Sequence, residues 1–405
     1  MPPPCEAGKR ETGNGKREQR ETVSSFSVFR FPFSVMKTAV VHDWLNGMRG
    51  GEKVLEQILP LVPDPTIFTL FHVPGSVSPA IERYPIRVSS LNRLPFVRRY
   101  YRNLLPVFPA AVEAFDLSGF DLVVSSSHCV AKGAVAPPGV PHLCYCHTPV
   151  RYAYEQFELY FPRGRTGLRA WKSLAISRLR AWDQATAGRP SRYLANSNAV
   201  AGRIRKHYGR EATVLSPPAD VEFFTPGSSV RGDFLLAVGA VVPYKRFEDA
   251  ILAASRLARP LVLVGRGPEE RRLRELAGPS VRILVDLSSG ELRDLYRSCA
   301  FFVQPGEEDF GIAAVEALAC GAPIVALSRG GILDMVTDGV EGVLYDMPGP
   351  QPLADAVERA AGIGFDYNRL RSTALRFSPE SFREGFRAAV EDLLGGRRTD
   401  EPMNR

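Results

Sequence analysis

The stretch FLLAVGAVVPYKRFEDAILAAS, Phe234 to Ser255, decides the fold. It begins with a short apolar run, passes through a turn that contains glycine and proline, and continues with apolar residues at helical spacing. A buried strand followed directly by an amphipathic helix is the repeating unit of α/β proteins with parallel sheets. The same order recurs along the rest of the chain, so we expect more such units on both sides of this stretch.

Downstream, strands and helices are expected to alternate. The predicted strands are PLVLVG, VRILV, AFFVQP and APIVAL, and the predicted helices are PEERRLRELA, GELRDLYRSC and GIAAVEALA. Such alternation gives a parallel sheet covered by helices on both faces, and ligands of such sheets bind outside the carboxyl ends of the strands.

The first half of the chain has the same pattern. From Met36 a strand in MKTAVVHDW precedes a flexible glycine turn, LNGMRGG, and a helix, EKVLEQIL. Further strands are predicted in TIFTLF, DLVVSSS, PHLCYCH and SRYLANS, with a long helical region from Leu168 to Ala187. The segment from Leu215 to Asp233 has the proline, glycine and serine density of a linker. We therefore predict two Rossmann-like, doubly wound domains, residues 36–215 and 216–380, facing each other across a cleft.

The two ends of the chain have a different composition. Residues 1–35 are rich in Pro, Gly, Glu, Lys and Arg, which predicts a disordered extension. A signal peptide is the alternative, but no A-x-A-like cleavage site follows the apolar residues, and a start at Met36 is favoured. The last helix, residues 381–396, is amphipathic and is expected to cross back to the first domain, and residues 397–405 are expected to form a flexible tail.

Composition excludes several classes of protein. With 405 residues, the chain exceeds the roughly 250 to 300 residues at which single cores stop growing. No stretch approaches the ~20 apolar residues that span a bilayer. The net charge of +7 favours anionic partners in general. The six cysteines lack the paired spacing of metal sites and are expected to be buried, reduced thiols in a cytosolic protein.

Four loops at predicted strand ends carry groups suited to a nucleotide-linked substrate. Lys245 and Arg246 are adjacent cations that suit a diphosphate, although a solvated surface pair is the alternative. Gly265 in VGRGPEE lets the backbone approach a ligand, or simply makes a tight turn. In LSRGGILDMV, Gly330 and Gly331 are expected to precede a helix with a second anion-binding terminus.

The most informative loop is PGEEDFGIAAVEALACG, Pro305 to Gly321. The N–H groups around Phe310, Gly311 and Ile312 at the start of the predicted helix suit a phosphate oxygen. Glu308 in the loop suits sugar hydroxyls, and Glu316 in the second helical turn suits the two ribose hydroxyls. A purely structural role as partners of the helix dipole, worth ~0.3 to 1 kcal/mol, explains the loop acids but explains Glu316 poorly.

Several of these segments resemble a known family. VGAVVPYKRFEDAI, PGEEDFGIAAVEALACGAPIVAL and SRGGILDMV occur in the order found in the donor domain of retaining GT-B glycosyltransferases of family 4. VVHDWLNGMRGGEKVLE, VVSSSHCVAKG and CYCHTPVRYAYE look like the bacterial mannosyltransferase-like branch of that family. The resemblance covers the chain from about Met36 to about Leu394.

The resemblance implies that a sugar moves from a nucleoside diphosphate sugar to an acceptor hydroxyl, with the anomeric configuration kept and with no metal and no cofactor. The favoured donor is GDP-mannose, and the favoured acceptor is a glycan or lipid-linked hydroxyl in polysaccharide or glycolipid biosynthesis. The family pattern includes an arginine where this chain has Ala240 and a glutamate where it has Asp334. Those two donor contacts are therefore in doubt.

The resemblance also implies roles for single residues. Glu308 matches the acid that contacts the donor sugar, Glu316 the acid on the ribose, and Lys245 the cation on the diphosphate. His147 matches a histidine that approaches the reacting sugar, although a satisfied turn residue is the alternative. Gly50 and Gly51 match a glycine turn whose backbone meets the donor phosphate or the acceptor.

Other interpretations remain open. A nucleoside diphosphate sugar epimerase, or a scaffold that binds sugar nucleotides without turnover, would use the same cleft. The segment from Arg93 to Phe108 mixes cations with aromatic residues, and is either a solvated helix face or a surface for anionic lipid. The expected localisation is cytoplasmic, with peripheral contact at the inner face of the cytoplasmic membrane as an addition. Nucleic acid is not expected as a partner.

Overall fold

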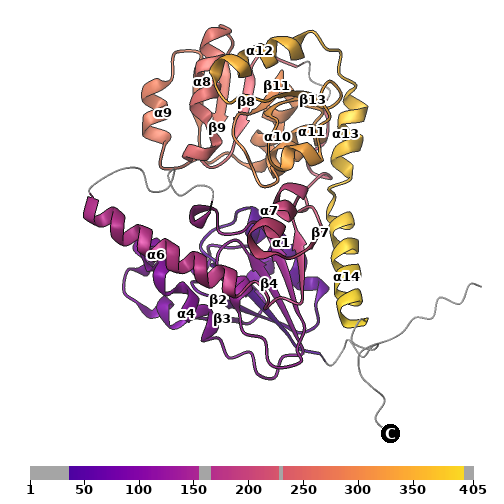
Figure 1. Cartoon of the computed structure of the whole chain (residues 1–405). Helices are drawn as coiled ribbons and strands as arrows, with labels where there is room; N and C mark the ends of the chain where they lie inside the picture. The colour runs from indigo at the N-terminus through magenta and orange to yellow at the C-terminus, as the bar shows by residue number, and fades with distance from the viewer. Residues whose placement is uncertain (1–35, 155–165, 228–230, 396–405) are drawn as a thin grey trace, which may run out of the picture. The chain divides into compact units, whose positions relative to one another are not determined.

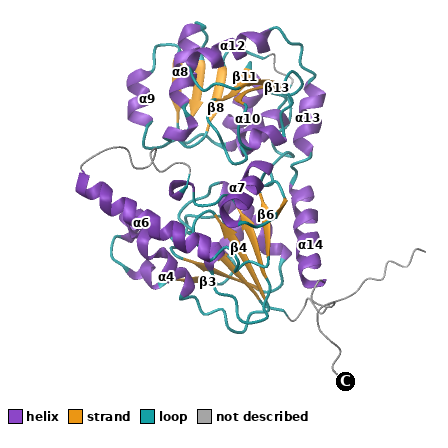
Figure 2. Ribbon diagram, viewed as in Figure 1, coloured by secondary structure: helices purple, strands orange, loops and turns teal. Residues whose placement is uncertain are grey.

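The structure is a computed structural model that describes residues 36–154, 166–227 and 231–395. Strands from the two halves of the chain form two separate sheets, each flanked by helices (Figure 1 and Figure 2). Both sheets lie within one compact unit, Ser34–Arg405. The predicted extension at residues 1–35 and the predicted tail at residues 397–405 lie outside the described residues.

The first sheet has seven strands, all parallel, in the order β3-β2-β1-β4-β5-β6-β7. The strands are β1 Thr38–His42, β2 Pro65–Thr69, β3 Ile86–Val88, β4 Leu122–Ser127, β5 His142–Cys146, β6 Arg192–Ala195 and β7 Ala212–Val214.

The second sheet has six strands, again all parallel, in the order β10-β9-β8-β11-β12-β13. The strands are β8 Leu235–Val238, β9 Leu261–Val264, β10 Val281–Leu284, β11 Phe301–Gln304, β12 Ile324–Leu327 and β13 Gly342–Tyr345. The fold is therefore α/β with two parallel-sheet domains, as predicted.

Helices connect the strands of both sheets. In the first half they are α1 Gly50–Ile58, α2 Pro79–Glu82, α3 Val97–Tyr100, α4 Phe108–Glu113, α6 Thr166–Ala185 and α7 Asn198–Tyr208. In the second half they are α8 Phe247–Arg256, α9 Glu270–Leu276, α10 Ser289–Ser298, α11 Ile312–Ala319, α12 Pro350–Ala361, α13 Tyr367–Leu375 and α14 Pro379–Gly395. Short 3₁₀ turns add η4 Ala131–Gly133, η6 Pro243–Lys245 and η7 Gly331–Asp334.

The apolar runs of the strands are explained by burial on both faces. Successive side chains of a strand point to opposite faces of the sheet. In β8, Leu235 and Ala237 pack into one apolar cluster, whereas Leu236 and Val238 contact another. A parallel sheet with helices on both faces needs such continuous apolar strands, which is why the runs were visible in the sequence.

Two local expectations were wrong. Gly50 and Gly51 do not lie in a flexible turn, because α1 begins at Gly50. The carboxylate of Glu52 accepts the backbone N–H of Arg49 at 3.0 Å and so closes the start of the helix. Gly330 and Gly331 do not precede a regular helix, since Gly331 itself begins the four-residue 3₁₀ turn η7.

Helix α14 packs against α1 of the first half of the chain. The ring of Phe382 in α14 lies 5.7 Å from that of Tyr145 at the end of β5, and Arg383 donates to the side chain of Gln57 at 3.3 Å. The amphipathic pattern of this helix thus reflects contact with the domain that is distant in sequence.

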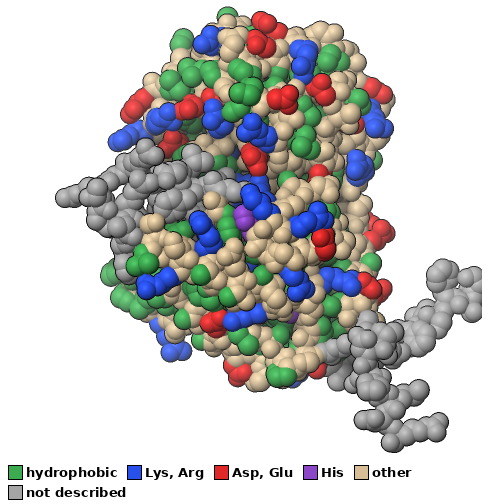
Figure 3. Space-filling view, viewed as in Figure 1, with side chains coloured by type: hydrophobic (Ala, Val, Ile, Leu, Met, Phe, Trp, Pro, Cys, Tyr) green, Lys and Arg blue, Asp and Glu red, His purple; other side chains and the backbone are tan. Residues whose placement is uncertain are grey.

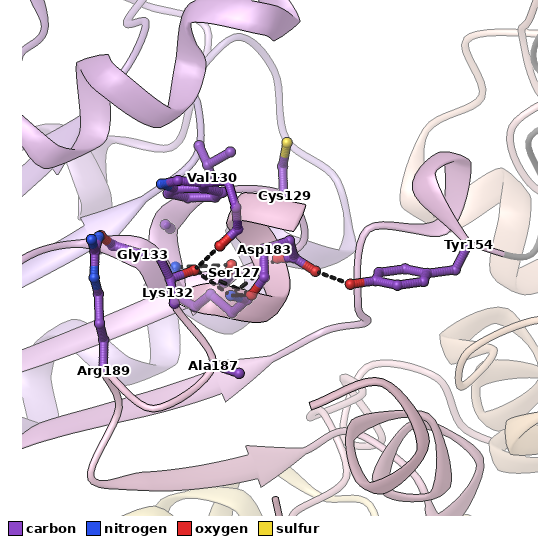
Figure 4. A network of polar contacts seen from close by, with 12 residues as sticks. Ser127, Cys129, Val130, Lys132, Gly133, Tyr154, Asp183, Ala187 and Arg189 are labelled. Atoms are coloured by element: carbon purple, nitrogen blue, oxygen red, sulfur yellow. Dashed lines mark hydrogen bonds and ion pairs between the residues drawn. The ribbon is translucent and has the colours of Figure 1, made fainter. Parts of the chain in front are cut away.

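A buried ion pair joins the loop after β4 to helix α6. The ammonium group of Lys132 lies 3.0 Å from Oδ1 of Asp183, and it donates to Oγ1 of Thr186 at 2.9 Å. Figure 4 shows the hydroxyl of Tyr154 directed at the other oxygen of Asp183, at 2.8 Å. Both charged side chains are fully buried. Each charge therefore depends on the other for its compensation.

We predict that Lys132→Ala destabilises the protein by about 3 to 5 kcal/mol, because Asp183 then stays buried without its cation. The measurement is the shift of the urea unfolding midpoint. Arg205→Ala is the matched control, because Arg205 pairs with Glu211 on the surface and water replaces the contact there. Equal midpoints for Lys132→Ala and the wild type would contradict the prediction.

Candidate functional site

The strand order of each sheet reverses once. In the first sheet the chain runs from β1 outward to β2 and β3, and then returns to place β4 on the other side of β1. In the second sheet β9 and β10 lie on one side of β8, and β11 lies on the other. Ligands of open parallel sheets bind in the crevice at such a reversal, outside the carboxyl ends of the two strands.

Lys245 and Glu308 meet at the reversal of the second sheet. Lys245 ends the turn η6 after β8, and Glu308 lies in the loop after β11. Nζ of Lys245 is 2.7 Å from Oε1 of Glu308, and both side chains are largely buried. The two residues that the sequence assigned to diphosphate and sugar thus lie side by side, with their charges balanced against each other.

Glycines make room for this pair. A Cβ atom on Gly239 would lie 2.3 Å from Nζ of Lys245, and one on Gly265 would lie 1.9 Å from the carbonyl oxygen of Gly239. Both residues have positive φ. Gly265, predicted to let backbone approach a ligand, is therefore required in any case for close packing of the loops after β8 and β9.

The start of α11 faces the same loop. Gly311 is the N-cap of α11 with φ of 99°, and a Cβ there would lie 2.9 Å from Oε1 of Gln304. Ile312 begins the helix, whereas the ring of Phe310 is buried 5.3 Å from that of Phe377. Of the three residues predicted at this terminus, Phe310 thus has a core side chain, and only its backbone is available to a ligand.

Glu316 is buried in the second turn of α11. Its Oε2 accepts the hydroxyl of Tyr296 at 3.0 Å, and its Oε1 lies 3.5 Å from Nζ of Lys53 in α1. Burial raises the pKa of Glu316 above its usual value, although Lys53 and Tyr296 act in the opposite direction. Neither partner was found from the sequence, because nothing in the local pattern around Tyr296 or Lys53 indicates that they approach Glu316.

Arg246 has a different side-chain partner from Lys245. Its backbone is left-handed, with φ of 52°, and its Nε is 2.6 Å from Oδ2 of Asp249 in α8. The side chain is 38% exposed. The predicted adjacent cations therefore have different environments, Lys245 beside Glu308 and Arg246 beside the first turn of α8.

The two other acids of the loop are bound by arginines from the first half of the chain. Arg151 donates to Oδ1 of Asp309 at 2.6 Å, and Arg203 of α7 pairs with Asp309 and with Glu307. The hydroxyl of Ser197 also donates to the carbonyl oxygen of Asp309 at 2.5 Å. The first turn of α11 contains no acid. The acids in this loop thus have specific cationic partners rather than the helix dipole alone.

His147 follows β5, beside the reversal of the first sheet. Its backbone is fixed at both ends, since its N–H donates to Ser127 and its carbonyl accepts from Asn196, each at 2.8 Å. Its Nε2 lies 2.8 Å from Oγ of Ser126, which in turn lies 3.1 Å from Nδ1 of His42. Burial, reinforced by the nearby rings of His128 and His42, lowers the pKa of His147 well below its usual range.

The glycines of α1 lie against this histidine. A Cβ on Gly51 would lie 3.8 Å from Nε2 of His147, and one on Gly50 would lie 3.4 Å from Cδ1 of Ile312. The two glycines thus bring the backbone of α1 close to the candidate residues of both sheets. A Cβ at position 51 would be in ordinary van der Waals contact with the rings of His42 and His147.

Two positions departed from the expected pattern, and the structure shows their surroundings. Ala240 is exposed after β8. Asp334 accepts the backbone N–H of Asn198 at 2.8 Å and its side-chain amide at 3.1 Å. The shorter acid therefore caps the start of α7.

The cysteines and the acids carry no sign of a metal centre where the structure describes them. Cys129, Cys144, Cys146, Cys299 and Cys320 are buried thiols without disulfides, and Cys5 lies outside the described residues. In the described ranges, no group of three or more His, Cys, Asp and Glu side chains is arranged to hold a metal ion.

Two family models match consecutive parts of the chain. The model described as Glycosyltransferase Family 4 matches residues 64–223, and the model described as Glycosyl transferases group 1 matches residues 220–374. The border between the two matches falls within the linker that precedes β8.

Curated relatives of this chain are also named glycosyltransferases. The D-inositol 3-phosphate glycosyltransferase of Acidothermus cellulolyticus is 30% identical over 51% of this chain and 54% of its own length. That of Nocardiopsis dassonvillei is 34% identical over 45% of this chain and 50% of its own length. The chain thus spans about half the length of the curated relatives it matches.

Solved structures share the fold. Anabaena HepE in complex with UDP superposes with a TM-score of 0.65 at 18% identity, covering 88% of this chain and 100% of HepE. Sucrose-phosphate synthase from Thermosynechococcus elongatus gives 0.67 at 18% identity, covering 89% and 100%. With two parallel-sheet domains, and with both family models matched in sequence, the chain belongs to the GT-B glycosyltransferases of the group 1 and family 4 type.

Proposed function

We propose that this protein transfers a sugar from a nucleoside diphosphate sugar to an acceptor hydroxyl, with retention of anomeric configuration and without a metal ion or other cofactor. The observation that carries the proposal is the pairing of Lys245 with Glu308 at the strand reversal of the second sheet. The favoured donor is GDP-mannose, and the favoured acceptor is a glycan or lipid-linked hydroxyl in polysaccharide or glycolipid biosynthesis.

Two observations support a nucleoside diphosphate sugar as the donor. Anabaena HepE, which has the same fold, was crystallised with UDP and with UDP-glucose. In this chain, a diphosphate placed at the reversal would meet the ammonium group of Lys245 and the N-terminus of α11. Both are favourable for an anion, because backbone N–H groups there lack helical partners and the helix dipole is positive.

The chemistry follows from the same contacts. As the bond from the anomeric carbon to the diphosphate stretches, negative charge builds on the leaving oxygens. Lys245 and the amides near Gly311 are fixed before the reaction begins, so they stabilise this charge without reorganisation. Glu308 beside them would accept hydrogen bonds from the sugar hydroxyls and orient the ring.

A thermal-shift panel of UDP, GDP and ADP with their sugar derivatives tests the donor class, and product analysis with a lipid extract tests the transfer. Binding of a sugar nucleotide with formation of a glycosylated product is the expected result. Interconversion of the donor alone would favour an epimerase, and binding without any turnover would favour a scaffold.

We predict that substitutions of the two paired residues have different effects, one on nucleotide affinity and the other on turnover. Lys245→Ala should weaken binding of the preferred nucleoside diphosphate about 10-fold to 100-fold, as expected for a lost charge-assisted hydrogen bond. Glu308→Gln should lower turnover and leave nucleotide affinity nearly unchanged. Calorimetric binding and initial rates measure both. Arg256→Ala, an exposed cation at the end of α8, is the control. Wild-type activity in both paired variants would overturn the assignment.

We predict that Glu316 recognises the ribose. The measurement is the affinity for the preferred nucleoside diphosphate relative to its 2′,3′-dideoxy form, and Glu316→Gln should shrink this ratio about 10-fold. Because burial raises the pKa of Glu316, its charged form destabilises the fold at pH values above that pKa. The variant should therefore melt no lower than the wild type at about pH 8. An unchanged ratio would contradict the role.

We also propose that the segment from Arg93 to Phe108 docks on anionic lipid. It folds into short helical turns that expose Leu94, Val107 and, with 84% of its surface accessible, Phe96. Figure 3 shows Lys and Arg interspersed with Asp and Glu on the face in view. In the proposed docking, insertion of the exposed apolar side chains adds to the attraction between the segment's arginines and anionic lipid. Among the helices of the described residues, none is both long and apolar enough to cross a bilayer.

Phe96→Ser should reduce sedimentation with vesicles of phosphatidylcholine containing about 30% phosphatidylserine. Met347→Ser in the second domain is the control, because this side chain is also exposed and apolar. Equal sedimentation of Phe96→Ser and the wild type would rule out docking through this segment.

A further inference from the structure

Arg151 of the first domain contacts the neighbours of both Lys245 and Glu308. It begins the short 3₁₀ turn that follows β5. Its Nε and Nη2 donate to Oδ1 of Asp309 at 3.0 and 2.6 Å, and its Cζ lies 4.8 Å from the centre of the Tyr244 ring. Tyr244 precedes Lys245 in the sequence, and Asp309 follows Glu308. Arg151 therefore bridges the two loops that provide the pair.

Glu308 lies in the irregular loop between β11 and α11. Its carbonyl oxygen accepts the N–H of Gly331 at 2.9 Å, and its carboxylate lies 2.7 Å from Nζ of Lys245. In the proposed function, the diphosphate of the donor pairs with Lys245. After that exchange, the direction of the Glu308 side chain depends on how firmly the loop itself is held.

Asp309 anchors this loop to the first domain. Its carboxylate pairs with Arg151 and with Arg203 of α7, and its carbonyl oxygen accepts the hydroxyl of Ser197 at 2.5 Å. The side chains of Arg151 and Asp309 are only 10% and 20% exposed, so water competes weakly for their contact. Asp309 is bonded directly to Glu308, so a shift of one moves the other. A misplacement of about 1 Å is enough to slow a reaction about 100-fold.

The guanidinium group suits both contacts of Arg151. Because the group is planar, one face can lie over the ring of Tyr244 while N–H groups at its edge reach Asp309. Burial acts to lower the pKa of Arg151, but the charges of Asp309 and Glu308 outweigh it, and the pKa is raised. Arg151 therefore stays charged, and it lies within electrostatic reach of Glu308.

We propose that Arg151 is a positioning residue, which acts through Asp309 to keep Glu308 directed at the sugar of the donor. This inference rests on the proposed glycosyl transfer, and it adds a residue of the first domain to the donor site of the second. Arg151 itself takes part in no bond change. Lys245 is held separately, by the close packing of Gly239 against its side chain, so binding of the nucleoside diphosphate does not depend on Arg151.

The test measures how much the sugar adds to binding, as the ratio of the Kd of UDP to that of UDP-glucose, and of GDP to GDP-mannose. For the pair that binds, Arg151→Met should lower this ratio about 10-fold, the size expected for a weakened charge-assisted hydrogen bond, while the affinity for UDP or GDP changes less than about 2-fold. Asp309→Asn should have the same effect, because it removes the charge through which Arg151 acts.

The matched control is Arg210→Met. Arg210 also lies over a tyrosine ring, that of Tyr193, and it donates to the carbonyl oxygens of Pro190 and Ser191 before β6, away from the strand reversals. Its loss should leave the ratio as in the wild type.

Two further variants separate positioning from other roles. In a Glu308→Ala background, Arg151→Met should lower the ratio no further, because no carboxylate is left for Arg151 to position. Arg151→Lys keeps the charge but not the planar group, so its ratio should fall between those of the wild type and Arg151→Met. It also serves as the test if Arg151→Met does not fold.

An unchanged ratio in Arg151→Met would overturn the inference. A further fall in the double variant would also overturn it, because Arg151 would then contact the sugar itself, and so would loss of UDP and GDP binding in Arg151→Met and Arg151→Lys alike. An unchanged ratio in Glu308→Ala would instead refute the role of Glu308 in the proposed function. A wild-type protein that binds none of the four nucleotides would refute the proposed glycosyl transfer before any variant is made.

Discussion

The strand order of each parallel sheet reverses once, and that reversal sets where the loops at the centre of the sheet can go. Crossover connections between parallel strands have a fixed hand, so a chain that first builds outward on one side of β1 or β8 must place its next helices on the other face. The loops at the carboxyl ends of the two central strands then diverge. Backbone cannot fill the space between them, and side chains define what can bind there.

Both reversals hold a pair of opposite or complementary polar groups. In the second sheet it is Lys245 with Glu308, and in the first it is His128 with Asp43. A partly buried pair of this kind contributes little to stability, because desolvation offsets most of the attraction. A charged ligand can take the place of one partner and pair with the other. Apolar side chains at the same positions could not bind such a ligand. The proposed function gives the Lys245–Glu308 pair a role in binding that its small contribution to stability does not explain.

Much of the surrounding structure serves to keep these groups in place. Gly239 and Gly265 let the loops after β8 and β9 close over Lys245, as any Cβ there would collide with backbone or with the ammonium group. On the other sheet, four backbone N–H groups hold Asp43, and the Lys132–Asp183 pair holds the loop that provides them. Lys245 and Asp43 are thus fixed in position by the surrounding backbone and side chains.

Most strands and many helices could be predicted from the sequence, since apolar runs and helical spacing are local consequences of burial on two faces or on one. The sequence also identified Glu316 as a candidate site residue, because neighbouring residues do not explain an acid on an otherwise apolar helix. The strands β3, β7 and β13 were not predicted, because three residues, or four that begin with glycine, carry too little pattern. Likewise, glycines before an apolar stretch suggested a helix after Gly331 where a 3₁₀ turn forms.

Which polar residues meet depends on the folding of the whole domain and not on any local pattern. Asp43 and His128 are 85 positions apart, and Arg203 lies 106 from Asp309. Spacing along the chain contains no information about such distances. They are set by which strands become neighbours in the sheet, and that depends on the packing of the whole domain rather than on any segment of it.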